Sequence, residues 1–175
     1  MKILSDFNLT VNQDEVEKHL EKAEARISAV SNKELLKQIF GLIDLTTLSE
    51  QDNTENVSLL CDKVNRQAEK YPDFPSVAAI CVYPELVAVV KENLDNPLIS
   101  IASVGGGFPA SQTYTNIKVM EIEQAIEQGA EEIDIVMPVG KFLFNDLEYV
   151  DYEIQVIKQR MGPIHLKVIL ETGSL

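Results

Sequence analysis

The pattern of hydrophobic and polar positions changes its period near residue 42. Before that point, over residues 12–30, apolar side chains recur at alternating steps of four and three in an otherwise charged segment. These apolar positions are Val16, Leu20, Ala23, Ile27 and Val30. The spacing predicts an amphipathic helix with one apolar stripe, and Asn12 is a suitable residue to cap its start.

A second short helix is expected directly after the first. Ser31 and Glu34 have the three-residue spacing of a capping box, which marks a helix start. The helix is expected to run to Phe40 and to end at Gly41. Residues 1–41 are therefore expected to form a helical extension that precedes the main domain.

From residue 42 onward, short apolar runs alternate with longer stretches of helical period. The runs predict strands over residues 42–48, 77–84, 99–104, 132–138 and 165–172. The stretches between them predict helices over residues 54–70, 84–94, 115–128 and 146–160, with Pro84 in a first turn and Gly129 as a stop signal. Strands and helices that alternate in this way are typical of a parallel sheet covered by helices.

The side chains of each expected strand divide into two sets of opposite parity. One set is aliphatic: Ile43, Leu45, Ile80, Val82, Ile133, Ile135, Val168 and Leu170. The other set is mostly polar: Asp44, Thr46, Cys81, Tyr83, Asp134, Lys167 and Glu171. An open sheet with helices on both faces would be apolar on both, so this division favours a barrel with a polar interior.

The expected fold class is α/β, of the (β/α)8 TIM-barrel family. A complete barrel has eight units and about 250 residues, whereas residues 42–175 hold only about five. A partial barrel is therefore expected, with two open strand edges over residues 42–48 and 166–172 and an exposed interior. A chain with these open surfaces is expected to associate, to misfold or to need its missing half, and a homo-oligomer is the expected assembly.

Composition and charge limit the function classes. The 175 residues carry 15 basic and 28 acidic side chains, a net charge of -13, which opposes binding to nucleic acid or to an anionic membrane. The first residues are too polar for a signal peptide, and no apolar run approaches a membrane span, so a cytoplasmic protein is expected. Cys61 and Cys81 lie in separate apolar segments and are expected to be reduced, buried thiols.

Three charged residues with inward parity are the candidates for chemistry. Asp134 lies on a strand that should be buried, so its carboxylate needs a partner. Lys167 on the next strand is the natural one, and Asp44 on the first strand is a further acid on the same face. These residues are expected either to transfer protons in catalysis or to form a structural ion pair. A metal site is not expected, because no cluster of histidine, glutamate and cysteine is present.

Five sequence blocks together resemble the deoxyribose-phosphate aldolase family. They are LIDLTTL, AAICVYP, VGGGFPASQT, GAEEIDIVMPVGKF and LKVILETG, and they extend over about residues 40–175. The resemblance implies a (β/α) barrel that reversibly cleaves the sugar phosphate 2-deoxy-D-ribose 5-phosphate to D-glyceraldehyde 3-phosphate and acetaldehyde. Family members use a lysine Schiff base and no cofactor, and an iminium of this kind accepts the electron pair of the breaking carbon–carbon bond.

The resemblance also implies roles for five residues. Asp134 matches the aspartate of the proton relay, and Asp44 matches an aspartate near the substrate hydroxyls. Cys81, with Thr46, is expected to line the substrate pocket. Lys167 matches an auxiliary lysine that orders the site, and it is not the Schiff-base lysine.

Two departures from the family pattern bear on activity. The family's Schiff-base lysine lies on a later strand, in a segment of the type F-I-K-T-S-T-G, which this sequence lacks. The chain is therefore expected to be an aldolase interrupted after its fifth strand and to be inactive in this form. The block around Phe108 also has an additional glycine, and it has Ser111 where many members have glycine.

Two other functions remain open from the sequence. The chain could be a non-catalytic barrel remnant that acts as an interaction or structural protein. Alternatively, another phosphate-binding barrel could use Lys167 as its own Schiff-base lysine, since the inward parity of Lys167 permits that chemistry.

Overall fold

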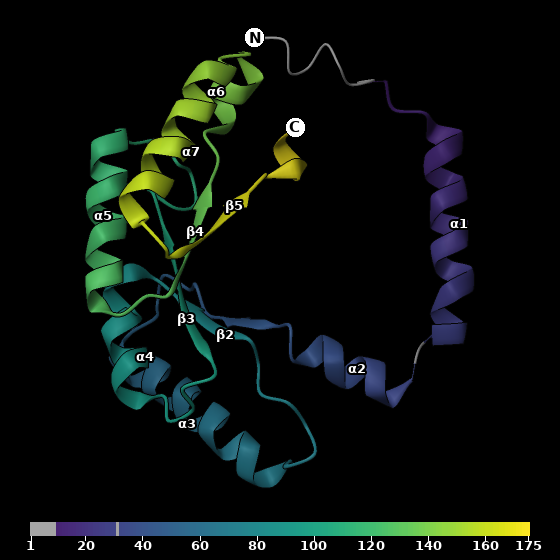
Figure 1. The fold of residues 1–175 in the computed structure, drawn as a ribbon, viewed down its shortest axis with the longest axis vertical. Coiled ribbons are helices and arrows are strands. Elements are labelled where there is room, and N and C mark those ends of the chain that lie inside the picture. The colour runs from purple at the N-terminus through teal and green to yellow at the C-terminus, as the bar shows by residue number, and fades with distance from the viewer. Residues whose placement is uncertain (1–9, 31) are drawn as a thin grey trace.

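The computed structural model describes residues 10–30 and 32–175, and it consists of a curved sheet with most of its helices on one face and the first two helices on the other side (Figure 1). Its helices are α1 (Gln13–Val30), α2 (Lys33–Phe40), α3 (Thr54–Lys70), α4 (Val87–Asn93), α5 (Thr115–Gln128), α6 (Val139–Leu143) and α7 (Leu147–Met161), with 3-10 turns η2 (Pro84–Leu86) and η3 (Thr172–Ser174). Its strands are β1 (Asp44–Thr46), β2 (Ala79–Val82), β3 (Ser100–Gly105), β4 (Glu132–Val136) and β5 (His165–Ile169).

The five strands lie in the order in which they occur along the chain, and every neighbouring pair is parallel. Each crossover therefore moves one strand further in the same direction. A doubly wound sheet reverses its strand order at a switch point, and this sheet does not. The arrangement is that of five consecutive β/α units of a TIM barrel, which confirms the fold class expected from the sequence.

Most element positions agree with the sequence, and the differences lie at the ends. Helix α3 has the expected bounds, and α5 ends at Gly129, which adopts a left-handed φ of 115°. The strands β1 and β5 are shorter than expected, because backbone pairing stops at Thr46 and Ile169. The segment after Pro84 begins as a 3-10 turn before α4, and the short helix α6 was not predicted.

The helix-covered face of the sheet holds the main core. Alternate strand residues such as Ile80, Val82, Ile133 and Ile135 are fully buried there against α3, α4, α5 and α7. Burial of side chains of this size contributes about 1.5–3 kcal/mol each. The aliphatic parity read from the sequence therefore faces the helices, as expected.

The inner face of the sheet is less open than the sequence suggested. Ala79, Cys81, Ala102 and Val104 of the central strands are buried, and the side chains that pack over them are Leu48, Tyr83 and Phe108. The expectation of an exposed interior is thus wrong for β2 and β3, because residues that follow the strands fold over them. The edge strands remain accessible, with intermediate or exposed side chains along β1 and β5.

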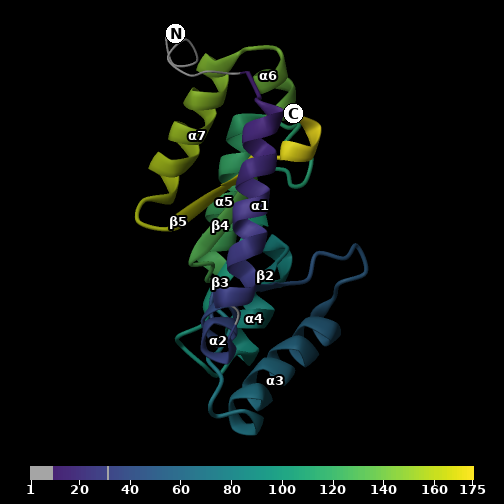
Figure 2. The same ribbon diagram turned by 90° about the vertical axis from the view of Figure 1, so that its right-hand side faces the viewer.

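The first two helices differ from the rest because they bury little. Asn12 caps α1 by accepting hydrogen bonds from the backbone N–H groups of Asp14 and Glu15. Helix α2 is capped by Asn32, whose side-chain oxygen accepts a hydrogen bond from the N–H of Leu35. The cap predicted from the sequence was Ser31, which lies outside the described residues. In Figure 2, α1 passes in front of the sheet, on the side opposite α5. None of the described helices is both long and apolar enough to cross a membrane.

Candidate active site

A cluster of one lysine and three carboxylates lies on the inner face of the sheet. Lys167 Nζ on β5 donates to Asp44 Oδ2 on β1 at 2.5 Å. The same ammonium lies 3.1 Å from Glu132 Oε2 and 3.1 Å from Asp134 Oδ1, both on β4. The structure thus brings together the three charged residues selected from the sequence and adds Glu132.

Sheet curvature makes this cluster possible. Asp44 and Lys167 are 123 positions apart and lie on the two edge strands, which do not pair with each other. Register places Asp134 beside Lys167 directly, since these two residues are partners on adjacent strands. Asp44 reaches them only because the concave face brings the side chains of β1 and β5 together.

The cluster holds Lys167 as a protonated ammonium. Burial by itself would lower the pKa of Lys167, but its contacts with Asp44, Asp134 and Glu132 outweigh burial and raise this pKa well above its ordinary value. Three carboxylates opposite one ammonium leave an excess of negative charge. A lysine in this state is a hydrogen-bond donor and a counter-ion, not a free amine nucleophile.

Asp134 is the carboxylate whose ionisation is least favoured. Burial is the main cause that raises its pKa, Lys167 offsets part of this effect, and Asp44 and Glu132 raise the pKa further. Its buried Oδ1 lies within ion-pair distance of Lys167 Nζ but makes no well-directed hydrogen bond. A carboxyl group with a raised pKa and a spare acceptor atom is a candidate for proton transfer.

Cys81 and Thr46 occupy adjacent positions beside the cluster. They are register partners on β2 and β1, on the same inner face as Asp44. Burial, with a smaller contribution from the charge of Asp134, raises the pKa of the Cys81 thiol to about 11. Cys81 is therefore a neutral thiol at physiological pH and can line a pocket without acting as a nucleophile. Thr46 Oγ1 donates to the backbone oxygen of Asp44.

Glu132 was missed by the sequence reasoning, although a signal was present. It lies two residues before Asp134, so both side chains project from the same face of β4. Glu132 also lies 3.8 Å from the exposed His165. Among residues 10–30 and 32–175 no group of three or more metal-ligating side chains is arranged to hold an ion, and the three carboxylates converge on Lys167 instead.

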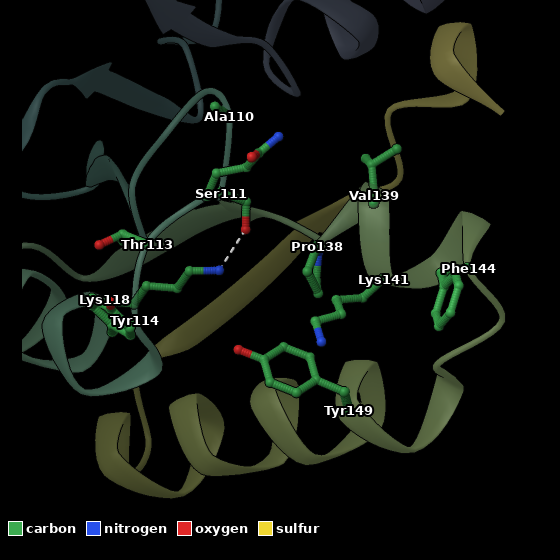
Figure 3. A pocket seen from close by; sticks show the side chains of 12 residues that line it. Ala110, Ser111, Thr113, Tyr114, Lys118, Pro138, Val139, Lys141, Phe144 and Tyr149 are labelled. Atoms are coloured by element: carbon green, nitrogen blue, oxygen red, sulfur yellow. Dashed lines mark hydrogen bonds between the residues drawn. The ribbon is translucent and has the colours of Figure 1, made fainter.

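A second lysine centre, also missed from the sequence, lies between α5 and α7. Lys118 Nζ donates to Glu153 Oε1 at 2.6 Å and to Ser111 Oγ at 2.7 Å, as Figure 3 shows for Ser111. Thr115 and Tyr149 both donate to the other carboxylate oxygen, Glu153 Oε2. The side chains of Lys118 and Glu153 are each only 2% exposed, so this is a closed ion pair with its polar atoms satisfied.

This buried pair lies beneath a pocket of about 690 Å³. The pocket is lined by residues 110–114 after β3, residues 138–141 after β4, and Lys118, Phe144 and Tyr149. Lys141 extends over the Tyr149 ring at 4.5 Å, as Figure 3 shows. No member of the Lys167 cluster lines this cavity. The convergent charges, rather than the cavity volume, therefore define the candidate active site.

The loop after β3 borders this pocket and explains one departure from the family pattern. Gly106 and Gly107 have φ values of 68° and 74°, and a Cβ atom on Gly107 would lie 2.9 Å from Thr113 Cγ2. The triple glycine therefore serves a tight turn. Ser111 also has a positive φ, 55°, and its hydrogen bond to Lys118 compensates for a conformation that favours glycine.

Comparisons with known proteins identify relatives of this chain. A human deoxyribose-phosphate aldolase is 35% identical over 180 residues, which covers 95% of this chain and 56% of that protein. The Metamycoplasma hominis deoxyribose-phosphate aldolase is 41% identical over 133 residues, covering 76% of this chain and 57% of its own length. The chain thus spans little more than half the length of these relatives.

Solved structures show the same fold. The aldolase QR15 matches with a TM-score of 0.67 and 26% identity over 78% of this chain and 57% of its own. The Aeropyrum pernix deoxyribose phosphate aldolase matches with a TM-score of 0.55 and 24% identity over 78% and 54%, and it supports the fold alone.

Five consecutive β/α units with a charged inner face define the class of protein as a TIM-barrel enzyme scaffold. Residues 39–175 match the model of the DeoC/LacD family of aldolases, and the chain belongs to this family.

Proposed function

We propose that this chain carries the acid–base half of a deoxyribose-phosphate aldolase site, for the reversible cleavage of 2-deoxy-D-ribose 5-phosphate. The observation that carries the proposal is the convergence of Asp44, Asp134 and Lys167 on the inner face of the sheet. These are the residues that the family resemblance assigns to the site. The named relatives support the substrate class, since they are deoxyribose-phosphate aldolases.

In this proposal Asp134 moves the proton. Its carboxyl group is partly buried, and burial raises its pKa, which makes the protonated state easier to reach than in an ordinary aspartate. Lys167 orients Asp134 and offsets part of the negative charge of the three carboxylates. Asp44 and Thr46 face the substrate hydroxyls, and the neutral Cys81 lines the aldehyde pocket.

Lys167 is not the nucleophile in this scheme. A Schiff base requires a neutral amine, and the three carboxylates around Lys167 favour the ammonium. Among the residues that the structure describes, no other lysine is placed with this cluster. We therefore expect the 175-residue chain to form no Schiff base and to show no turnover by itself.

The test joins this chain to the part of the barrel that carries the Schiff-base lysine. A chimera would append to Leu175 the strands that follow the fifth strand of the Metamycoplasma hominis relative. Both the chain and the chimera would be incubated with deoxyribose 5-phosphate and borohydride, which reduces a Schiff base to a stable adduct. The intact mass of each would then be measured.

We expect the 175-residue chain to stay at 19.5 kDa and the chimera to gain one adduct and to cleave the substrate. Asp134→Asn in the chimera should reduce kcat by about 10²–10⁴-fold while the adduct still forms, because the change removes a proton-transfer group and not the nucleophile. An adduct on Lys167 would contradict the auxiliary role. A folded chimera without any adduct would contradict the proposed function and favour a non-catalytic remnant.

Oligomerisation is a second part of the proposal. The Aeropyrum pernix aldolase, whose fold matches this chain, is described as tetrameric. We infer that the protein works as a homo-oligomer.

A further inference from the structure

The loop after β3 reaches the inner face of the sheet through Phe108. The Phe108 side chain packs against the buried inner-face residues of the central strands, which include Cys81, Ala102 and Val104. Its ring also meets the ring of Tyr83 edge-on, with centroids 6.2 Å apart. Cys81 is only 2% exposed, and Phe108 is one of the side chains that cover this part of the candidate active site.

Two side chains of helix α5 hold this loop on either side of Phe108. Glu121 Oε2 accepts a hydrogen bond of 2.8 Å from the backbone N–H of Gly107, directly before Phe108. Lys118 Nζ donates to Ser111 Oγ at 2.7 Å, on the far side of Phe108. The N–H of Ser111 in turn donates to the backbone oxygen of Gly107 at 2.8 Å and closes the loop. Lys118 and Glu121 have the i, i+3 spacing of one helix face and together form what we call the α5 clamp.

The backbone of the loop depends on contacts of this kind. Gly106 and Gly107 adopt left-handed φ values of 68° and 74°, and Ser111 adopts 55°. Glycine loses more conformational freedom on folding than any other residue, so contacts must offset the cost of fixing this turn. The α5 clamp supplies them from the helix-covered side of the sheet, whereas Phe108 lies on the inner side. The loop thus connects the outer layer of the fold to the candidate site.

We propose that Lys118 and Glu121 are positioning residues of the candidate active site. By fixing residues 107–111 they hold Phe108 as a wall beside Cys81, and this wall limits the size of the aldehyde that the site accepts. The part that concerns aldehydes rests on the proposed function, in which Cys81 lines the aldehyde pocket. The part that concerns the wall does not depend on any activity.

The α5 clamp is separate from the groups that would transfer protons. The partners of Lys167 are Asp44, Glu132 and Asp134, and neither clamp residue belongs to this cluster. Loss of the clamp should therefore leave the acid–base groups in place and change which aldehydes fit. One methylene group in a well-packed pocket changes kcat/KM by about 10-fold to 200-fold, so a displaced wall should be measurable as a change of specificity.

The first test measures the access of a reagent to Cys81 in the 175-residue chain. The unmodified chain and its variants are labelled with iodoacetamide at one fixed pH, and the rates at Cys81 and Cys61 are read separately by peptide mass. Burial raises the pKa of the Cys81 thiol to about 11, so loss of cover increases both the access and the thiolate fraction. Cys61 is fully buried in the core on the helix-covered face and reports global unfolding.

Glu121→Ala should raise the labelling rate of Cys81 by about 10-fold to 100-fold and leave that of Cys61 unchanged, because it removes a hydrogen bond to a charged acceptor. Glu121→Gln keeps an acceptor oxygen and should retain most of the protection. The control Glu127→Ala removes an exposed carboxylate near the end of the same helix and should change neither rate. Unchanged labelling of Cys81 in Glu121→Ala, or an equal rise at both cysteines, would overturn the proposal.

Further variants test the other contact and the covering side chain. Ser111→Ala removes the bond to Lys118 and should raise the rate at Cys81 more than the rate at Cys61. Phe108→Ala should raise the rate at Cys81 while the α5 clamp is intact. Addition of Glu121→Ala to Phe108→Ala should then have little further effect, because both changes act through the same ring. Fully additive effects would contradict the role of Phe108 as the wall that the clamp holds.

The second test uses the chimera described above in the direction of aldol formation. D-Glyceraldehyde 3-phosphate is the acceptor, and acetaldehyde or propanal is the donor. Glu121→Ala should raise the ratio of kcat/KM for propanal to that for acetaldehyde by about tenfold, mainly through a lower KM for propanal, and Glu121→Gln should not. An unchanged ratio in an active chimera would overturn the specificity role. An inactive chimera would contradict the proposed function and the aldehyde part with it, whereas the labelling rates decide the positioning role in either case.

Discussion

The two lysine centres, Lys118 and Lys167, differ in burial and in the number of carboxylates that contact the ammonium group. Lys118 is 2% exposed and has one carboxylate, Glu153, whose other oxygen accepts from Thr115 and Tyr149. Lys167 is 30% exposed and has three carboxylates, Asp44, Glu132 and Asp134. The first centre is neutral and closed, and the second is anionic and partly open.

The difference separates a structural ion pair from a site with unused chemical capacity. At Lys118 every charge has one opposite charge, and removal of either partner leaves the other uncompensated inside the protein. At Lys167 the carboxylates are in excess, so one of them, Asp134, can take up a proton. Surplus charge next to solvent is a feature of functional sites rather than of cores.

The largest effect is expected from Lys118→Met. This change leaves Glu153 buried without its counter-ion and should lower the free energy of unfolding by about 3–5 kcal/mol, as measured by urea denaturation. The double variant Lys118→Met and Glu153→Met should recover most of this loss, because two apolar side chains can replace a buried pair. A single variant as stable as the unmodified chain would contradict the closed-pair interpretation.

Two substitutions of Ser111, next to Lys118, distinguish the contribution of its hydrogen bond from the cost of its backbone conformation. Ser111→Ala removes the bond to Lys118 and keeps the positive φ, so we expect a loss of about 2 kcal/mol. Ser111→Gly also removes the bond but relieves the strained backbone, and it should lose about 1 kcal/mol less. Thermal unfolding of both variants checks the order. An alanine variant more stable than the glycine variant would contradict it.

A smaller effect is expected from Lys167→Met. The pair with Asp44 is partly exposed and screened by solvent, so its loss should lower the free energy of unfolding by only about 1 kcal/mol. The remaining carboxylates repel one another, and added salt should reduce the loss. The effect of Lys118→Met should change little with salt, because that pair is buried. Urea denaturation of both variants at low and high salt gives the comparison, and equal salt sensitivity would contradict it.

The smallest effect, and one that depends on pH, is expected from Asp134→Asn. The pKa of Asp134 is raised in the folded protein, so the stability that this group contributes is present below its unfolded pKa of about 3.9 and is lost as pH rises through the folded value. Asparagine does not titrate. Relative to the unmodified chain, the variant should therefore be more stable at about pH 7 than at about pH 3. Urea denaturation at both values checks the sign, and the opposite sign would show that Lys167 more than offsets burial.

The sequence predicted the elements well where the signals are local. The bounds of α3 and the end of α5 at Gly129 follow from periodicity and a stop signal, and both are confirmed. The cap of α2 was assigned to Ser31, whereas Asn32 forms it, because neighbouring polar residues compete for one role. The strand ends were placed too far out, since apolar character continues beyond the last paired residue.

The candidate site was predicted in part for a related reason. Parity alone placed Asp44, Asp134 and Lys167 on one face of the sheet, and the same rule applied to Glu132 would have found it. Lys118 was overlooked although it lies four residues before Ile122, on the buried face of α5. A lysine at the helical spacing of core positions predicts a buried ammonium group with a partner. Its partner Glu153 on α7 could not be identified in this way.

The sequence by itself determined which side chains share a strand face, because the two-residue period of a strand is a property of neighbouring residues. The same parity favoured a barrel over a doubly wound sheet, and in a barrel consecutive strands are neighbours. Only the tertiary structure decided that Asp44 reaches Lys167 and that Lys118 meets Glu153. Those contacts depend on the curvature of the sheet and on the packing of α5 against α7, and both are set by many residues acting together.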